Sequence, residues 1–168
     1  MIPSIKFFGL NEFSARLPSA IFGSLAILSS FYLVLVLVKS PQVALITAFL
    51  LATSPWAIQF SRMALEANLA VFFITSGLLF LLVSFERPFA LYVSSVFFSV
   101  SLYSYHAAKL FVPLFLLCLF FVFHEKLKKN IKVLIGSLFL AIFLVSPLVF
   151  NLTENSLRPK NFILCKHI

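Results

Sequence analysis

Long apolar runs, each bounded by a short polar connector, dominate this chain. The first, residues 17–38, contains no charged side chain. A run of about twenty such residues forms a helix that can cross a hydrocarbon core about 30 Å thick. Hydrophobic residues make up 62% of the 168 residues and charged residues only 11%, whereas soluble domains carry about 45–50% and about 25%. The sequence therefore predicts a polytopic helical membrane protein.

The runs predict an all-α fold of about six transmembrane helices. They cover residues 17–38, 42–60, 69–85, 89–102, 110–123 and 133–150. Pro55 is expected to kink or end the second helix, and Pro18 to sit in the first turn of the first helix, where no backbone bond is lost. No run alternates as a strand does, and open sheet edges are not tolerated in lipid. Three parts are expected: the end of an outer-side loop, a membrane domain and a loosely ordered outer-side polar tail, at residues 1–16, 17–150 and 151–168.

Lysine and arginine are unevenly divided between the two sets of connectors. One set carries six of them: Lys39, Arg87, Lys126, Lys128, Lys129 and Lys132. The opposite set carries only Arg62 and Lys109. Because short cytoplasmic loops collect Lys and Arg, the first set is predicted to be cytoplasmic and both termini to lie outside the plasma membrane. The net charge of +8 is scattered among the connectors and forms no basic face, which argues against a nucleic-acid partner.

Three stretches on the predicted outer side carry unusual polar chemistry. Glu12 and Arg16 are four residues apart, which fits an interfacial anchor with a local acidic partner or part of a ligand site. Arg62 and Glu66 repeat this spacing. They fit either a surface ion pair on one helix or two groups that face an anionic, metal-bound or hydroxyl ligand. Spacing alone leaves both interpretations open for each pair.

The third stretch holds two tyrosines and two basic residues. They are Tyr103, Tyr105, His106 and Lys109. Aromatic rings and a lysine at a helix end are typical of an interfacial belt. The same residues also fit a phosphate- or sugar-facing patch, in which Lys109 supplies charge and the rings supply stacking surface.

Trp56 and Cys118 have simpler interpretations. Trp56 is expected to be an aromatic-belt residue. Cys118 lies inside an apolar run, and its spacing to the second cysteine is not that of a metal site. It is predicted to be a small packing residue.

Taken together, these stretches resemble the membrane glycosyltransferases with the C-type multi-spanning fold, in the branch of aminoarabinose transferases and protein O-mannosyltransferases. The segment FGLNEFSARLPSA, residues 8–20, is similar to the family block G-x-x-E-x-x-x-R-L-P-S/N-A. Residues 54–66 resemble the next block, in which S-P is followed by S/A-R-x-x-x-D/E. Residues 103–113 resemble a later block beside the sugar–lipid cavity. The resemblance covers roughly residues 5–150.

The resemblance implies transfer of a sugar from a polyprenyl-phosphate donor to an acceptor on the outer side. Substrate binding then falls to Arg16, Arg62, Tyr105, His106 and Lys109. Glu12 and Glu66 become candidates for supporting catalysis or for holding a divalent metal, and the identity of any cofactor stays open. The lipid bilayer and the polyprenyl-phosphate-sugar donor are the partners that this implies.

The chain departs from the family in its acidic residues and in its length. It contains no Asp, so the usual catalytic aspartate is missing. Only eleven residues precede Glu12, where relatives have a first span and an outer loop. The chain is therefore expected to be an internal fragment that is inactive alone. Two other functions stay open: a polytopic transporter or flippase component, with ionisable residues deep in the bilayer, and a non-catalytic membrane subunit.

Overall fold

The computed structural model describes residues 11–62, 66–105, 108–128 and 131–157. Within these ranges the chain forms seven helices and no strand, as the all-α prediction requires. The helices are α2 (Glu12–Val38), α3 (Pro41–Thr53), α4 (Pro55–Arg62), α5 (Glu66–Val83), α6 (Ala90–Ser104), α7 (Ala108–Lys128) and α8 (Ile131–Leu157).

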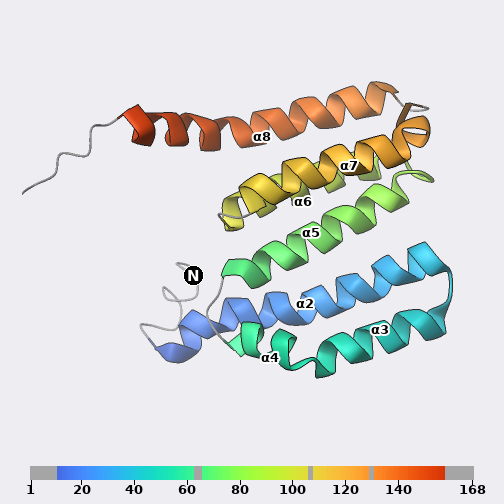
Figure 1. The fold of residues 1–168 in the computed structure, drawn as a ribbon, viewed down its shortest axis with the longest axis vertical. Helices are drawn as coiled ribbons and strands as arrows, with labels where there is room; N and C mark the ends of the chain where they lie inside the picture. Colours follow the sequence, from blue (N-terminus) through green and yellow to red (C-terminus); the bar gives the residue numbers. More distant parts are fainter. Residues whose placement is uncertain (1–10, 63–65, 106–107, 129–130, 158–168) are drawn as a thin grey trace, which may run out of the picture.

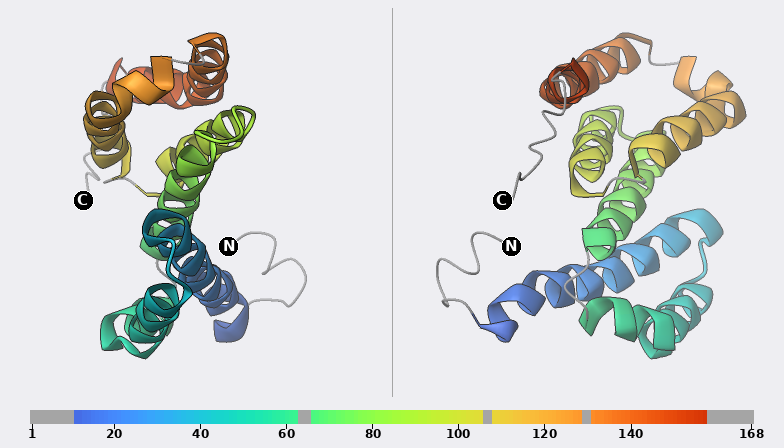
Figure 2. Two further views of the ribbon diagram at one scale, coloured as in Figure 1. Left: turned by 90° about the vertical axis from the view of Figure 1, so that its right-hand side faces the viewer. Right: turned by 60° about the vertical axis from the view of Figure 1, so that its left-hand side comes forward.

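The long helices run back and forth, so that the connectors gather at two opposite ends (Figure 1). Neighbours in space form a row in the order α3, α2, α5, α6, α8, in which α4 packs on α2 and α7 packs on α6 and α8. Both views in Figure 2 show α2–α4 at one end of this row and α7–α8 at the other, with α5 between them. The order of the row therefore differs from the order along the chain: α2, and not α4, lies beside α5 on the side opposite α6.

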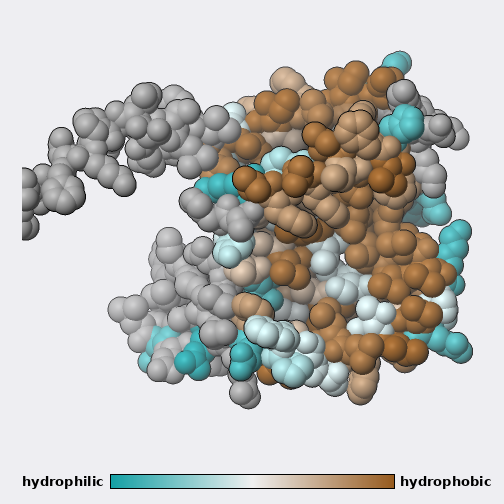
Figure 3. All heavy atoms as spheres, viewed as in Figure 1, coloured by the Kyte–Doolittle hydropathy of each residue, from teal (hydrophilic) through white to brown (hydrophobic). Residues whose placement is uncertain are grey.

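The seven helices cover the six predicted spans, and α3 and α4 together cover the second one. Two helices are long and apolar enough to cross a membrane by themselves, over Arg16–Val38 and Ile131–Leu148, and α3 with α4 forms a third candidate if this bent pair is one span. Three shorter apolar helices complete the set. Figure 3 shows an apolar band across the middle of the molecule with hydrophilic side chains at its edges. The protein is thus an all-α polytopic membrane protein.

Proline sets the turns and the one sharp bend. Lys39 has a left-handed φ of 56° and its N–H bonds to Leu35 O at 2.9 Å, which closes α2 as a helix C-terminus commonly closes. Pro41 then occupies the first turn of α3, where its missing N–H costs no hydrogen bond. Ser54, which precedes Pro55, is extended at ψ 124°, because proline disfavours the helical conformation in the residue before it. The result is a bend of 60° between α3 and α4, so the predicted break at Pro55 is confirmed.

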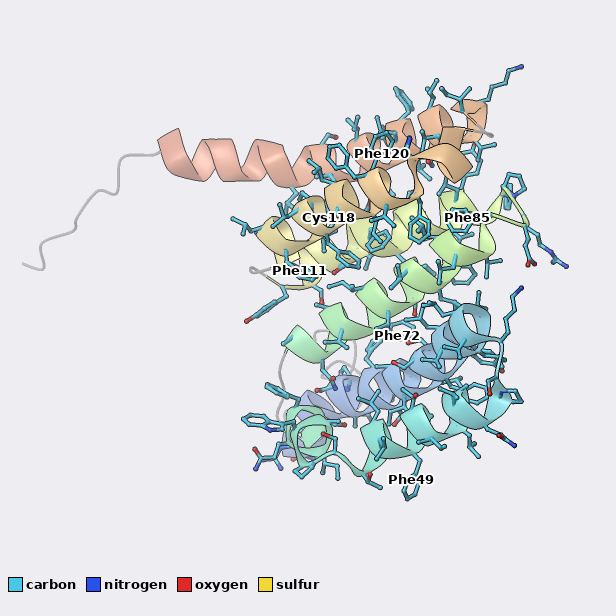
Figure 4. The ribbon with its side chains drawn as sticks, turned by 45° about the vertical axis from the view of Figure 1, so that its right-hand side comes forward. Phe49, Phe72, Phe85, Phe111, Cys118 and Phe120 are labelled. Atoms are coloured by element: carbon cyan, nitrogen blue, oxygen red, sulfur yellow. The ribbon has the colours of Figure 1, made fainter. Side chains whose placement is uncertain are left out.

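Aromatic rings and small polar residues share the helix interfaces. Phe72 on α5 lies between helices, with its ring 5.4 Å from that of Phe22 on α2 and 6.1 Å from that of Phe97 on α6, whereas Phe49 on α3 points away from the other helices (Figure 4). Buried serines let helices approach closely. One of them, Ser94, donates a hydrogen bond from Oγ to Gly77 O at 2.7 Å and so ties α6 to α5.

Three expectations about these elements were wrong in detail. Helix α2 begins at Glu12, so Pro18 lies inside the helix and not in its first turn. Helix α8 continues through Asn151–Leu157, into the tail that was expected to be loosely ordered. Cys118 is exposed on α7, so it does not pack against another helix of the part of the chain that the structure describes. It is therefore not a packing residue within this chain.

Candidate functional site

The structure places the three polar stretches at one end of the molecule. The start of α2, the break between α4 and α5, and the connection from α6 to α7 all lie on the same side in Figure 1. The opposite side carries the turns after α2 and α5 and the connection from α7 to α8. This arrangement follows from the alternating helix directions.

Glu12 and Arg16 lie on the first turns of α2, on one helix as their spacing requires. Residues four apart in a helix face the same side. The Arg16 side chain is exposed and takes part in an interaction. The Glu12 side chain lies outside the described set. The structure therefore places both residues in the first two turns of α2. It does not define a contact between the two charges.

Arg62 and Glu66 lie on two different helices. Arg62 is the last residue of α4 and Glu66 is the first residue of α5. Residues 63–65 between them lie outside the described residues, so the choice between a surface ion pair and two ligand-facing groups stays a prediction. Their side chains lie outside the described set, so only their backbone positions enter the argument.

Ser19 joins the three helices that carry these residues. Its Oγ donates to Phe60 O on α4 at 3.1 Å. Its own carbonyl accepts a hydrogen bond of 2.8 Å from Asn68 Nδ2 on α5. Phe60 O belongs to the last turn of α4, so the Ser19 hydroxyl ties that turn to α2. We call Ser19, Phe60 and Asn68 the polar junction.

The polar junction is buried and tightly packed. Ser19 is 1% exposed and Asn68 8%, so an unpaired polar group here would be costly. Gly23 lies one turn further along α2. A Cβ at this position would be 2.7 Å from Asn68 Nδ2 and 2.9 Å from Ser61 Oγ, closer than real Cβ contacts. The absence of a side chain at Gly23 therefore allows α4 and α5 to approach α2.

The residues near the α6–α7 connection form a separate group at the same end. Tyr105 caps α6 in an extended conformation and is exposed, and its carbonyl accepts a hydrogen bond from Ala108 N at 3.1 Å. Lys109 lies in the first turn of α7, is half-buried and takes part in an interaction. His106 lies outside the described residues. This group belongs to α6 and α7, whereas the polar junction belongs to α2, α4 and α5.

Tyr103 has a structural partner. Its OH donates to Leu144 O and so links α6 to α8. This bond accounts for Tyr103 without a substrate, whereas the alternatives for Tyr105 stay open.

A metal site is not assembled by the part of the chain that the structure describes. No group of three or more His, Cys, Asp or Glu side chains comes together there. Glu12 and Glu66 supply two carboxylates at most, from the starts of α2 and α5, whereas hard divalent cations take about six oxygen ligands. These residues do not make up a metal site by themselves, and we derive no chemical step through a metal.

Sequence reasoning missed the polar junction. Asn68 stands at the beginning of an apolar run, and a lone amide entering a helix interface needs a hydrogen-bond partner. That signal was available. Ser19 offered no such signal, because serine is common in membrane helices and its partners are 41 and 49 residues away in the sequence.

One known protein family matches most of the chain. A family model described as dolichyl-phosphate-mannose-protein mannosyltransferase matches residues 3–150. No curated protein and no solved structure matches the chain.

Proposed function

The chain belongs to the dolichyl-phosphate-mannose-protein mannosyltransferase family, and from this premise we propose that it binds a polyprenyl-phosphate-sugar donor for transfer of the sugar to an acceptor. The observation that carries the proposal is the polar junction. It fixes the start of α2 against the α4–α5 break, and these two stretches carry Arg16, Arg62 and Glu66. The two guanidinium groups supply the phosphate-binding charge.

Arginine is suited to this role. Its planar guanidinium presents several N–H donors that match phosphate oxygens in pairs. In the transfer, the acceptor oxygen bonds to the anomeric carbon as the bond from that carbon to the phosphate oxygen breaks. The leaving polyprenyl phosphate gains negative charge, so Arg16 and Arg62 stabilise it more strongly than the bound donor. The proton of the acceptor hydroxyl passes to a carboxylate that acts as a general base.

Glu66 stands where the family often has Asp, and the chain contains no Asp. We therefore expect this chain to bind the donor without turning it over by itself, which makes binding the proper measurement. Tyr105, His106 and Lys109 are proposed as a second substrate-facing group, toward the sugar or the acceptor. The end that carries all these residues is proposed to face the outer side of the plasma membrane, because the opposite end holds most connector lysines and arginines.

The test is the affinity of the chain in lipid nanodiscs for a polyprenyl phosphate. Replacing Arg16 or Arg62 by Gln should weaken binding about ten- to a hundredfold, because a charge-assisted hydrogen bond is worth about 1.5–3 kcal/mol. Arg87→Gln is the matched control, because Arg87 is an exposed arginine at the opposite end. Equal affinities for the wild type and both variants would refute the proposal.

The two other functions make different predictions. A transporter or flippase component needs ionisable groups along a path through the bilayer. The Lys, Arg, Glu and His side chains that the structure describes lie in connectors or in the two turns nearest a helix end, as Lys39, Arg87 and Lys132 illustrate. This distribution does not favour transport. A non-catalytic subunit would show no affinity for polyprenyl phosphate above that for an uncharged polyprenol.

A further inference from the structure

We propose that Asn68 is a positioning residue, which sets the placement of Arg16, Arg62 and Glu66 through the polar junction; the inference rests on the function proposed above. Asn68 itself is buried against α2. Its effect on phosphate binding is therefore indirect, through the helices that carry the charged residues.

The first step is that each charged residue lies close in the sequence to a member of the polar junction. Arg16 precedes Ser19 by three residues, Arg62 follows Phe60 by two, and Glu66 precedes Asn68 by two. Each charged residue thus lies within about one helical turn of a member of the junction. A shift of a junction residue moves the backbone of the nearest charged residue by a similar amount, because a helical turn is rigid.

The second step is that the chain connection from α3 to α4 does not by itself hold α4 against α2. Residues 54–62 leave α3 at a bend of 60°, so α3 does not fix the direction of α4 relative to α2. The hydrogen bond from Ser19 Oγ to Phe60 O and the close approach at Gly23 do so instead. Asn68 holds the Ser19 backbone from the other side, at 2.8 Å.

The third step is the match between the bonding capacity of Asn68 and its surroundings. The side-chain nitrogen has a carbonyl acceptor 2.8 Å away and lies in the space that a Cβ of Gly23 would fill. An apolar side chain of similar size would fill that space without holding the carbonyl. The helices would remain in contact, but their relative placement would no longer be fixed by a directional bond.

The experiment compares Asn68→Leu with a matched control, Thr75→Val. Thr75 forms another hydrogen bond between α2 and α5, to Ser29 at 2.7 Å between the two hydroxyl oxygens, about two turns further from the charged residues. Affinity in nanodiscs is measured for two probes, a polyprenyl phosphate and the uncharged polyprenol of the same chain length. Asn68→Leu should weaken phosphate binding about tenfold, as expected for a residue that acts through coupling.

The two probes separate positioning from general damage. Mispositioned arginines reduce affinity for the phosphate and leave polyprenol binding unchanged, whereas a loosened fold reduces both. Thr75→Val should change neither affinity by more than about twofold. The proposal is overturned if Asn68→Leu binds the phosphate like the wild type, if it loses both probes together, or if Thr75→Val loses as much.

A distance measurement tests the junction independently of any ligand. Nitroxide labels are attached at Ala20→Cys on α2 and Gln59→Cys on α4, both exposed positions, after the two native cysteines are replaced by serine. The distance distribution should be narrow in the parent and in Thr75→Val and broad in Asn68→Leu; an unchanged distribution in Asn68→Leu overturns the positioning role. If the wild type shows no affinity for the phosphate, the proposed function fails, and these distances still decide whether Asn68 positions the helices.

Discussion

At the scale of single residues, Gly23 makes the sharpest prediction about stability. In an exposed helix, replacing Gly by Ala stabilises by about 1 kcal/mol. Here the added methyl would meet Asn68 Nδ2 at 2.7 Å and Ser61 Oγ at 2.9 Å. Since Asn68 is buried and already bonded, it must give up its hydrogen bond or push the helices apart. We expect Gly23→Ala to lower the free energy of unfolding by about 1–3 kcal/mol.

The measurement for Gly23→Ala is reversible unfolding of the chain in mixed micelles. Ser24→Ala is the matched control, because Ser24 is the next residue on α2, is exposed, and donates a hydrogen bond within its own helix, to Ala20 O. The control should lie within about 0.5 kcal/mol of the parent. A Gly23→Ala variant more stable than the parent would show that α4 and α5 do not pack as described.

The sequence identified charged residues better than the residues that place them. Arg16, Arg62 and Glu66 stand out because charges are rare in this chain. Ser19 and Gly23 do not, since small residues occur at many helix interfaces in membranes. Their importance comes from partners on α4 and α5 that are far away in the sequence, and a single sequence does not reveal such pairs.

At the scale of helices, proline and hydropathy predicted turns well and helix ends less well. Pro55 separates α3 from α4, as expected, and Pro41 begins α3. Hydropathy predicts which residues lie in the hydrocarbon core. A helix ends only where its backbone hydrogen bonds end, which can be several residues beyond that core. Helix α2 therefore extends outward to Glu12 and α8 to Leu157, over polar residues that continue a helix already formed.

The contact between α6 and α8 gives the prediction at this scale. Pro147 lies inside α8 and has no N–H, so Phe143 O loses its helical donor; Ser146 Oγ bonds to that carbonyl at 3.0 Å. On the next residue, Leu144 O accepts from Tyr103 OH. Tyr103→Phe removes this link, and the free energy of unfolding in micelles should fall by about 0.6–1.7 kcal/mol.

Tyr32→Phe serves as the matched control for Tyr103→Phe. Tyr32 is exposed on α2, where its ring packs edge-on against Phe31 at 5.4 Å. Loss of its hydroxyl should leave the stability of the chain unchanged. Equal effects of the two substitutions would mean that the bond to Leu144 O does not hold α8 against α6.

At the scale of the whole molecule, the sequence predicted at which end of the molecule each connector lies, but not which helices are neighbours. Alternating directions follow from the five connectors between the six predicted spans, so the shared end of residues 12–16, 62–66 and 105–109 was predictable. The row α3, α2, α5, α6, α8 was not. It depends on which faces carry small residues and rings, such as Gly77 against Phe98, and almost every face of these helices is apolar.

The orientation in the membrane is the last prediction, and it concerns all helices together. The end with Lys39, Arg87 and the α7–α8 connector should face the cytoplasm, because positive connectors are retained there. Gln59→Cys on α4 and Glu86→Cys in the turn after α5 are exposed and lie at opposite ends. In cells that express a chain with both native cysteines replaced, a membrane-impermeant maleimide should label position 59 in intact cells and position 86 only after permeabilisation. The reverse pattern would place the polar junction, Arg16 and Arg62 on the cytoplasmic side. The proposed donor would then have to bind from the cytoplasmic side.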